Sequence, residues 1–193
     1  MSTPRMAGGS AAQPAEAPRL AVPVDERDHV RGPADAPITL VEYGDFECPD
    51  SARATSVLRE VQHRLGGRLR LVFRHFPLRH KHPHAQWAAE AAEAAAAQGR
   101  FWEMHDQLFV HQRLLGDEHL DLYITRLGLD AGRLRRDLAE HVHAARVEAD
   151  CEGGRRSGVE GTPTFFIDGV RYDGVYELEP LAAALDAAAG RTT

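Results

Sequence analysis

Cysteine is scarce in this chain of 193 residues, where Cys48 and Cys151 are the only two. Secreted domains that depend on disulfides usually carry more cysteines, so the composition indicates a cytoplasmic protein. Long apolar runs are also missing, because none approaches the roughly 18 residues that a membrane-spanning helix needs. The N-terminal stretch MSTPRMAGGSAAQPAEAPRL has no continuous apolar core behind its positive charge and lacks the pattern of a signal peptide. No membrane partner is therefore expected.

Blocks of like charge are absent as well. The formal net charge is -6, and acidic and basic residues are interleaved along the chain. Binding of nucleic acid or of anionic lipid usually needs a basic patch or stripe, so neither partner is expected. The residues that are present, 43% hydrophobic and 27% charged, suit one globular domain with a sizeable core.

The start of the chain differs in composition from the rest. Residues 1–22 are rich in Ala, Pro, Gly and Ser and show no periodicity. Such a segment buries too little apolar surface to offset its ordering entropy, so we predict a disordered tail. The first structural signal is PITLVEY, residues 37–43, an apolar and β-branched run between prolines and Gly44. This pattern predicts a buried strand.

A helix and a second strand follow. The helical pattern begins at about Pro49 and ends at Gly66 and Gly67. Its apolar stripe consists of Ala54, Val57, Leu58, Val61 and Leu65. RLRLVFRHF, residues 68–76, alternates Leu and Phe with Arg and Val and predicts a strand. Strand, helix and strand in this order imply a parallel pair with a right-handed crossover.

The middle of the chain, from about residue 82 to 155, has helical patterns and no strand candidates. HAQWAAEAAEAAAAQG predicts an alanine-rich helix that stops at Gly99, and RFWEMHDQLFVHQ predicts a second. DEHLDLYITRLG and DAGRLRRDLAEHV follow, with Asp117 and Asp130 as the expected N-caps. The segment therefore predicts an all-helical block.

The C-terminal part returns to strands. TPTFFIDG and VRYDG predict two strands joined by a tight Asp168-Gly169 turn, and ELEPLAAALDAAA predicts a last helix. The full order is β-α-β, a helical block, then β-β-α, which indicates an α/β fold with a helical insertion.

The cysteine at the end of the first strand has the setting of a nucleophile. Cys48 precedes Pro49 at a helix N-terminus, where unpaired backbone N–H groups and the helix dipole favour a thiolate. The nearby Asp50 opposes a second negative charge, although an acid there also stabilises the first helical turn. Ser51 stands where a CxxC pair has its second cysteine, one helical turn from Cys48, and its hydroxyl is placed to donate a hydrogen bond to the thiolate.

Four motifs in order carry a family resemblance. They are GDFECPDS, FPL, FWEMHDQLF and SGVEGTPTFFIDG, and over about residues 28–189 they resemble the DsbA-like branch of the thioredoxin superfamily. The resemblance implies an α/β thioredoxin fold of β-α-β and β-β-α halves with an inserted helical domain. We expect the halves at residues 23–80 and 156–193 and the insertion at residues 81–155. The departure from the family pattern is the missing second cysteine.

The resemblance also implies a second part of the site. Thr162-Pro163 matches the family's cis proline, which lies beside the cysteine and presents the preceding backbone to an extended substrate. The expected catalytic residues are Cys48 and Ser51. The expected substrate-binding residues are Pro49, Asp50, Thr162 and Pro163.

A single thiolate limits the chemistry. It forms a mixed disulfide with a substrate but cannot close that intermediate into an internal disulfide, so release needs an external thiol. The sequence thus predicts a thiol-disulfide oxidoreductase of isomerase, reductase or deglutathionylating type that uses no cofactor. Its partners would be protein or peptide thiols and disulfides, with glutathione as a co-substrate. The alternatives are a redox-weak module that docks a peptide or protein at the Pro163 edge, and a transferase in which Ser51 orients a bound thiol. The oligomeric state is left open.

The remaining chemistry-bearing residues are interpreted as structural. Cys151 is expected to be a packed thiol, with a resolving cysteine for Cys48 as the alternative. The histidines of RHKHPH, at positions 80, 82 and 84, lack a carboxylate or cysteine that would complete a ligand set, so we predict a solvated loop and no metal. Trp102 is expected in the core, and His105 as a supporting group.

Overall fold

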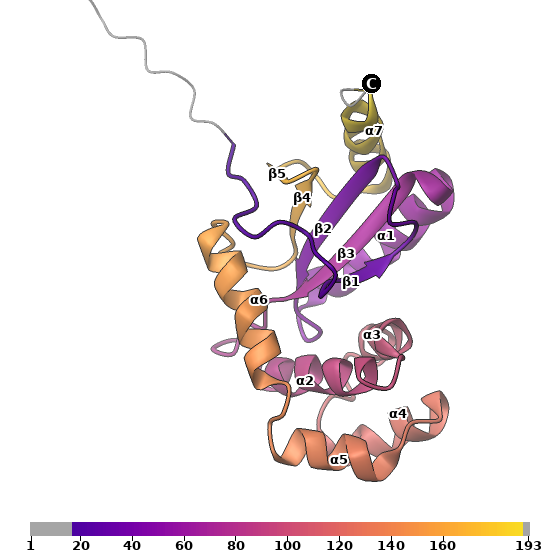
Figure 1. Cartoon of the computed structure of the whole chain (residues 1–193), viewed down its shortest axis with the longest axis vertical. Helices are drawn as coiled ribbons and strands as arrows, with labels where there is room; N and C mark the ends of the chain where they lie inside the picture. The colour runs from indigo at the N-terminus through magenta and orange to yellow at the C-terminus, as the bar shows by residue number, and fades with distance from the viewer. Residues whose placement is uncertain (1–16, 191–193) are drawn as a thin grey trace, which may run out of the picture.

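The computed structural model describes residues 17–190, which form one sheet with helices packed around it (Figure 1). The strands are β1 (His29–Arg31), β2 (Ile38–Gly44), β3 (Leu69–His75), β4 (Thr164–Ile167) and β5 (Val170–Tyr172). The helices are α1 (Pro49–Leu65), α2 (Ala85–Ala96), α3 (Phe101–Val110), α4 (Leu120–Leu127), α5 (Ala131–Ala139), α6 (Ala144–Arg156) and α7 (Leu178–Ala189). The predicted fold class is confirmed.

The sheet has the strand order β1-β3-β2-β4-β5. β2 and β3 are parallel, with Leu40 opposite Leu71, and α1 connects them, as the strand-helix-strand pattern predicts. β4 pairs antiparallel with β2, and β5 with β4 through the Asp168-Gly169 turn. Both turn residues have positive φ, as a type I′ hairpin turn requires. The sequence analysis missed β1, because three residues in a polar stretch show no periodicity.

Both faces of the sheet are covered, which explains why β2 and β3 are almost continuously buried. One face packs against α1 and α7 through apolar side chains that include Leu40, Leu58 and Leu181. The opposite face packs against α2 and α6 through residues that include Val41 and Val147. Alternate side chains of β3 therefore point to opposite faces of the sheet, and both of these faces are buried.

Arg74 is the charged residue on β3 that this double coverage buries. Its side chain and that of Asp28 are each only 4% exposed and form an ion pair at 2.7 Å. The guanidinium also donates to Tyr43 Oη at 3.1 Å and to the carbonyls of Val22 and Pro23. These bonds satisfy a buried charge that the core would otherwise exclude.

The helical block lies at one end of the sheet, where α2, α3, α4 and α5 gather (Figure 1). Its core also contains Phe46 and Phe73, so the block is packed directly onto the loop before Cys48 and onto β3. Asp130 is the N-cap of α5, as predicted, because its side chain accepts from the Arg133 N–H at 2.9 Å. The predicted N-cap at Asp117 is wrong. A short 3₁₀ turn separates Asp117 from α4, and its carboxylate accepts instead from Trp87 Nε1.

The predicted tail is partly wrong. Residues 1–16 lie outside the described residues. Residues 17–22 run along the sheet, where Arg19 forms a bridge with Val170 and the Leu20 N–H donates to Gly169 O at 2.8 Å. The unpaired edge of β5 supplies backbone partners that composition alone does not reveal.

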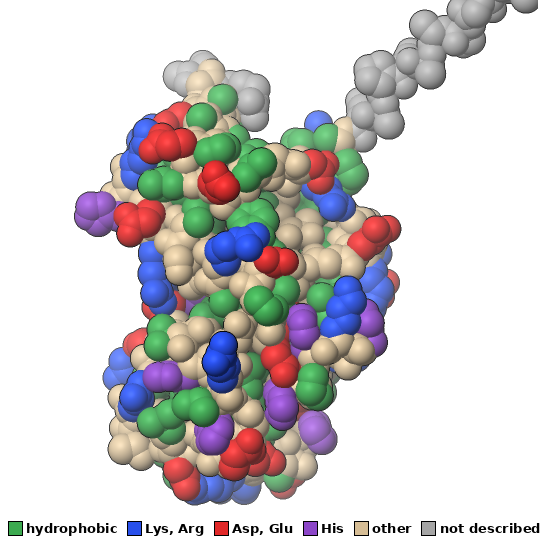
Figure 2. All heavy atoms as spheres, turned by 180° about the vertical axis from the view of Figure 1, so that it is seen from behind, with side chains coloured by type: hydrophobic (Ala, Val, Ile, Leu, Met, Phe, Trp, Pro, Cys, Tyr) green, Lys and Arg blue, Asp and Glu red, His purple; other side chains and the backbone are tan. Residues whose placement is uncertain are grey.

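The surface carries charges of both signs. Figure 2 shows acidic and basic side chains interspersed over the face drawn there. No helix among the described residues has the length and apolar character of a membrane span.

Candidate active site

Cys48 is the N-cap of α1. β2 ends at Gly44, a short loop follows, and Pro49 occupies the first helical turn, where its missing N–H needs no partner. The Cys48 carbonyl accepts the first helical hydrogen bond, from the Ala52 N–H at 3.1 Å. The thiol is therefore held at the positive end of the helix, as the strand-Cys-Pro-helix order predicts.

The structure brings Cys48 together with Thr162 and Pro163, which lie 114 residues away in sequence from it. The Thr162-Pro163 peptide bond is cis, in agreement with the expectation. Cys48 is 6% exposed, and its Sγ donates to the Thr162 carbonyl oxygen at 3.3 Å. Thr162 and Pro163 are half-buried, so the edge that they form reaches the surface.

The thiol is subject to two opposing influences. The helix N-terminus favours the thiolate. The hydrogen bond to Thr162 O favours the thiol, because a thiolate has no proton to donate to a carbonyl. The Thr162 carbonyl is thus already engaged by the thiol in the structure.

Ser51 does not make the predicted hydrogen bond with the thiol. Its side chain is fully buried, and its Oγ accepts from the Asp45 N–H at 3.4 Å. No hydrogen bond joins Ser51 to Cys48 in the part of the chain that the structure describes. The hydroxyl is directed to the loop because a buried backbone N–H there needs an acceptor.

Asp50 lies on the exposed side of the helix N-terminus. Its carboxylate is 3.1 Å from Arg53 Nη2, one turn along α1, and both side chains are more than half exposed. Solvent and Arg53 both screen this charge, so its effect on the thiol is weaker than the sequence indicates.

The loop before Cys48 is held by a buried carboxylate that the sequence analysis did not single out. Asp45 accepts from the N–H groups of Glu47 and Leu78, each at 2.8 Å, and from His82 Nδ1 at 2.7 Å. Its carbonyl accepts from the Cys48 N–H at 3.1 Å. The Asp45 network thus fixes the approach of the chain to the thiol.

The histidine-rich segment is therefore not simply a solvated loop. His80 is exposed, as predicted, but the His82 side chain is only 18% exposed because it binds Asp45. His84 contacts Glu47 through both its N–H and its Nδ1, at 2.6 and 3.0 Å. The prediction was wrong for His82, because it considered only partners within the motif and not the loop that faces it, whereas His84 is exposed as predicted.

Gln112 joins the helical block to the same loop. Its Nε2 donates to Phe46 O at 2.9 Å and to Cys48 O at 2.8 Å. A single glutamine after a helix carries no sequence signal for such a role. The structure places it as a positioning residue for Cys48.

Glu42 is a third residue, after Asp45 and Gln112, that was not predicted from the sequence. It is 1% exposed on β2, directly between Phe73 and Phe165 of the neighbouring strands, and its Oε1 has no hydrogen-bond partner. Burial raises the pKa of the Glu42 carboxyl to about 8, so the group is largely a neutral acid at pH 7. The sequence feature that could have indicated this buried acid is a glutamate inside the apolar run ITLVEY.

Cys151 and His105 have the structural character that was predicted. Cys151 lies on α6, is 4% exposed, and burial raises the pKa of its thiol to about 11. Both cysteines are free thiols. His105 is buried among Phe46, Phe73 and Phe109, and burial lowers the pKa of its imidazole to about 4.

A cysteine at the N-terminus of α1, beside a cis proline on a mixed five-stranded sheet, defines a thioredoxin-fold thiol protein. Residues 25–187 match the sequence profile of the family described as Thioredoxin. The chain belongs to that family.

Solved structures with this fold are DsbA-like proteins and related oxidoreductases. Oxidised BdbD from Bacillus subtilis superimposes with a TM-score of 0.78 at 20% identity, covering 92% of this chain and 100% of that one. A thioredoxin-like oxidoreductase from Silicibacter pomeroyi gives 0.73 at 25% identity, covering 88% and 95%. α-DsbA1 from Wolbachia pipientis gives 0.75 at 19% identity, covering 90% and 96%.

The curated relatives that the chain matches are named as Na(+)/H(+) antiporters. The chain is 52% identical over 170 residues to Na(+)/H(+) antiporter NhaA 1 of Salinispora arenicola, a match that covers 88% of this chain and 26% of the relative. It is 45% identical to the protein of the same name from Mycolicibacterium gilvum, with 89% and 28% covered. The chain thus spans about a quarter of the length of these relatives.

Proposed function

We propose that this protein exchanges thiols and disulfides through Cys48 alone. The supporting observation is the position of Cys48 Sγ at the N-terminus of α1, 3.3 Å from the carbonyl oxygen before Pro163. A substrate strand that pairs with the Thr162 backbone would bring its disulfide to this sulfur and free the thiol from its carbonyl.

The proposed reaction has two steps. The Cys48 thiolate attacks one sulfur of a disulfide R–S–S–R′, so that a Cys48–S–S–R bond forms and R′–S⁻ leaves. A thiolate from outside, such as glutathione or a substrate thiol, then attacks the R sulfur and releases Cys48. Cys151 is not the resolving group in this scheme, because its thiol is buried on α6 with a raised pKa. The protein would act as an isomerase, a reductase or a deglutathionylating enzyme without a cofactor.

The test is an intact-mass measurement after incubation with oxidised glutathione. We expect one glutathione adduct on the native protein and on Cys151→Ala, and none on Cys48→Ala. Ser51→Cys supplies an internal thiol, so its adduct should collapse into a disulfide with loss of glutathione. A native protein that acquires no adduct, or one that acquires it equally on Cys48→Ala, would refute the proposal.

A binding module is the second candidate. The observation that favours it is that Cys48 is buried and donates to Thr162 O, which stabilises the unreactive thiol. In this case a peptide or protein would dock at the Pro163 edge, and Cys48→Ala would bind it as the native protein does. Loss of peptide binding in Cys48→Ala would exclude this candidate and support exchange.

The names of the relatives describe whole proteins, of which the match to this chain covers about a quarter. We propose that the shared segment supplies the thiol function in those proteins, because the matched residues are the ones that build the thioredoxin fold here. We propose the cytoplasm as the location, since a domain with two free thiols and no disulfide suits a reducing compartment.

A further inference from the structure

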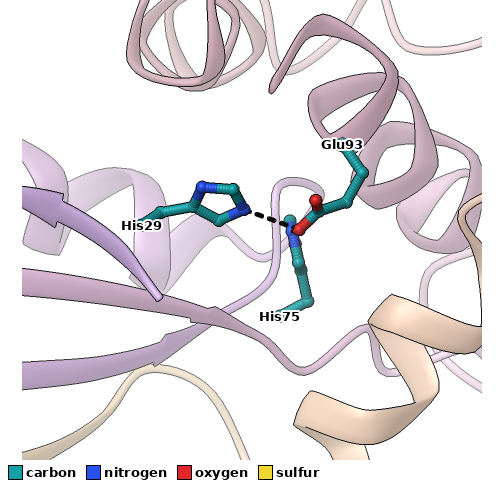
Figure 3. Close-up of side chains that lie close together, drawn as sticks. All are labelled: His29, His75 and Glu93. Carbon is teal, nitrogen blue, oxygen red and sulfur yellow. Dashed lines mark hydrogen bonds and ion pairs between the residues drawn. The ribbon is translucent and has the colours of Figure 1, made fainter. Parts of the chain in front are cut away.

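Three side chains with metal-binding atoms converge at the end of β3. His29 of β1, His75 at the end of β3 and Glu93 of α2 place one ligand atom each within 4.8 Å of one another (Figure 3). His29 Nε2 lies 2.7 Å and His75 Nε2 2.8 Å from the same oxygen, Glu93 Oε1. The exposed fractions of these side chains are 15%, 1% and 7%.

The carboxylate of this His29-His75-Glu93 cluster is buried and accepts hydrogen bonds from both imidazoles. A buried carboxylate with two imidazole nitrogens aimed at it is a donor set that divalent transition metals prefer.

We propose that His29, His75 and Glu93 bind a divalent transition-metal ion of the zinc class. Two imidazole nitrogens and one carboxylate oxygen are three of the four ligands of a tetrahedral ion, and water is the fourth. Bonds of about 2.0–2.1 Å set ligand atoms about 3.3 Å apart around such an ion. The Nε2 to Oε1 distances of 2.7 and 2.8 Å would open by about 0.5 Å around such an ion, and all three ligand atoms already lie within 4.8 Å of one another.

Neighbouring side chains constrain the His29-His75-Glu93 cluster. The His29 ring stacks on Phe101 with ring centroids 3.4 Å apart, which limits its rotation. Arg146 Nε also forms an ion pair with Glu93 Oε1, at 3.9 Å, besides its closer pair with Asp150. Binding through Nε2 requires each imidazole to hold its proton on Nδ1, and the His75 Nδ1 is buried without a hydrogen-bond partner among the described residues.

The three ligands come from three elements that are distant in the sequence. A metal ion here would join the edge strand β1 and its neighbour β3 to the first helix of the helical block. It would therefore stabilise the packing of the block on the sheet, independently of the thiol chemistry. The sequence alone predicts no metal, because positions 29, 75 and 93 share no spacing pattern along the chain.

The test uses the Cys48→Ala/Cys151→Ala protein, so that no thiolate can bind the metal. Zn²⁺ is titrated into the metal-free protein in competition with a chromophoric chelator. We expect one ion per chain, and at least a 10-fold loss of affinity in His29→Gln and in Glu93→Gln. The matched control is His84→Gln, an exposed histidine paired with a different glutamate, which should bind as the background does. Zinc should raise Tm in the background and in the control but not in His29→Gln.

A measurement on the unmutated ligands covers the case in which a variant fails to fold. In NMR spectra of the thiol-free protein, Zn²⁺ should shift the Nε2 resonances of His29 and His75 and leave those of His84 in place. Zinc binding that is unchanged in both ligand variants, absent from the thiol-free protein, or without effect on these two histidine rings would overturn the proposal.

Discussion

Glu42→Gln should change how stability depends on pH. Glu42 has no partner for Oε1 and a carboxyl pKa raised from 4.5 to about 8 by burial. A folded pKa above the unfolded one means that the protonated acid's contribution is complete below pH 4.5 and is lost as pH rises to about 8. At about 1.36 kcal/mol per pH unit, this group lowers the free energy of unfolding of the native protein by about 3 kcal/mol between pH 5 and 7, and by about 5 kcal/mol in all.

Glutamine has the same shape as glutamate and does not titrate. The free energy of unfolding of Glu42→Gln therefore lacks this decrease with rising pH. The assay is urea unfolding of both proteins from pH 5 to 8, and the quantity of interest is the difference between their free energies of unfolding. Contributions of other titrating groups cancel in that difference. We expect it to shift by about 3 kcal/mol in favour of Glu42→Gln from pH 5 to 7. Glu60→Gln, at an exposed position of α1, is the control and should stay within about 0.5 kcal/mol of the native protein. Parallel curves for native and Glu42→Gln would refute the reasoning and show that Glu42 is solvated.

Three further outcomes follow from described contacts. Asp28→Asn should lower the free energy of unfolding by about 3–5 kcal/mol in urea titrations, because it leaves the Arg74 guanidinium buried without its counter-ion; a loss under about 1 kcal/mol would contradict this. Gln112→Ala should slow formation of the glutathione adduct at Cys48, followed by mass against time, with the Tm little changed; an unchanged rate would show that its two hydrogen bonds do not position the thiol. Cys151 should react slowly with iodoacetamide in the native state and rapidly in denaturant, and fast native labelling would mean that α6 does not shield it.

The sequence was sufficient for the parts of the fold that repeat a pattern. The strand before Cys48, the helix from Pro49 to Leu65 and the Asp168-Gly169 hairpin all lie where periodicity and turn chemistry put them. β1 was missed because it is too short to show a period and exists only by pairing with β3. The N-cap at Asp117 failed because Trp87, a tertiary neighbour, takes its carboxylate.

For the site, the sequence located the residues but not their partners. Cys48, Thr162 and Pro163 meet as the family resemblance implies. The hydrogen bonds of Asp45 and Gln112 to distant backbone groups could not be predicted, since each depends on how the helical block packs. The direction of the Ser51 hydroxyl depends on an N–H in the loop that only the folded backbone defines.

The segment at residues 17–22 has a consequence for association between molecules. A sheet edge presents unpaired backbone groups on which another chain can add a strand and begin to aggregate. Here the Leu20 N–H and the Pro18 carbonyl occupy such groups beside β5, through Gly169 O and the Arg171 N–H, each at 2.8 Å. The opposite edge, β1, offers only three residues, which is too short a template for stable pairing. The chain therefore covers one edge of its sheet with its own backbone, and the other edge is short. Both features disfavour polymerisation through sheet edges.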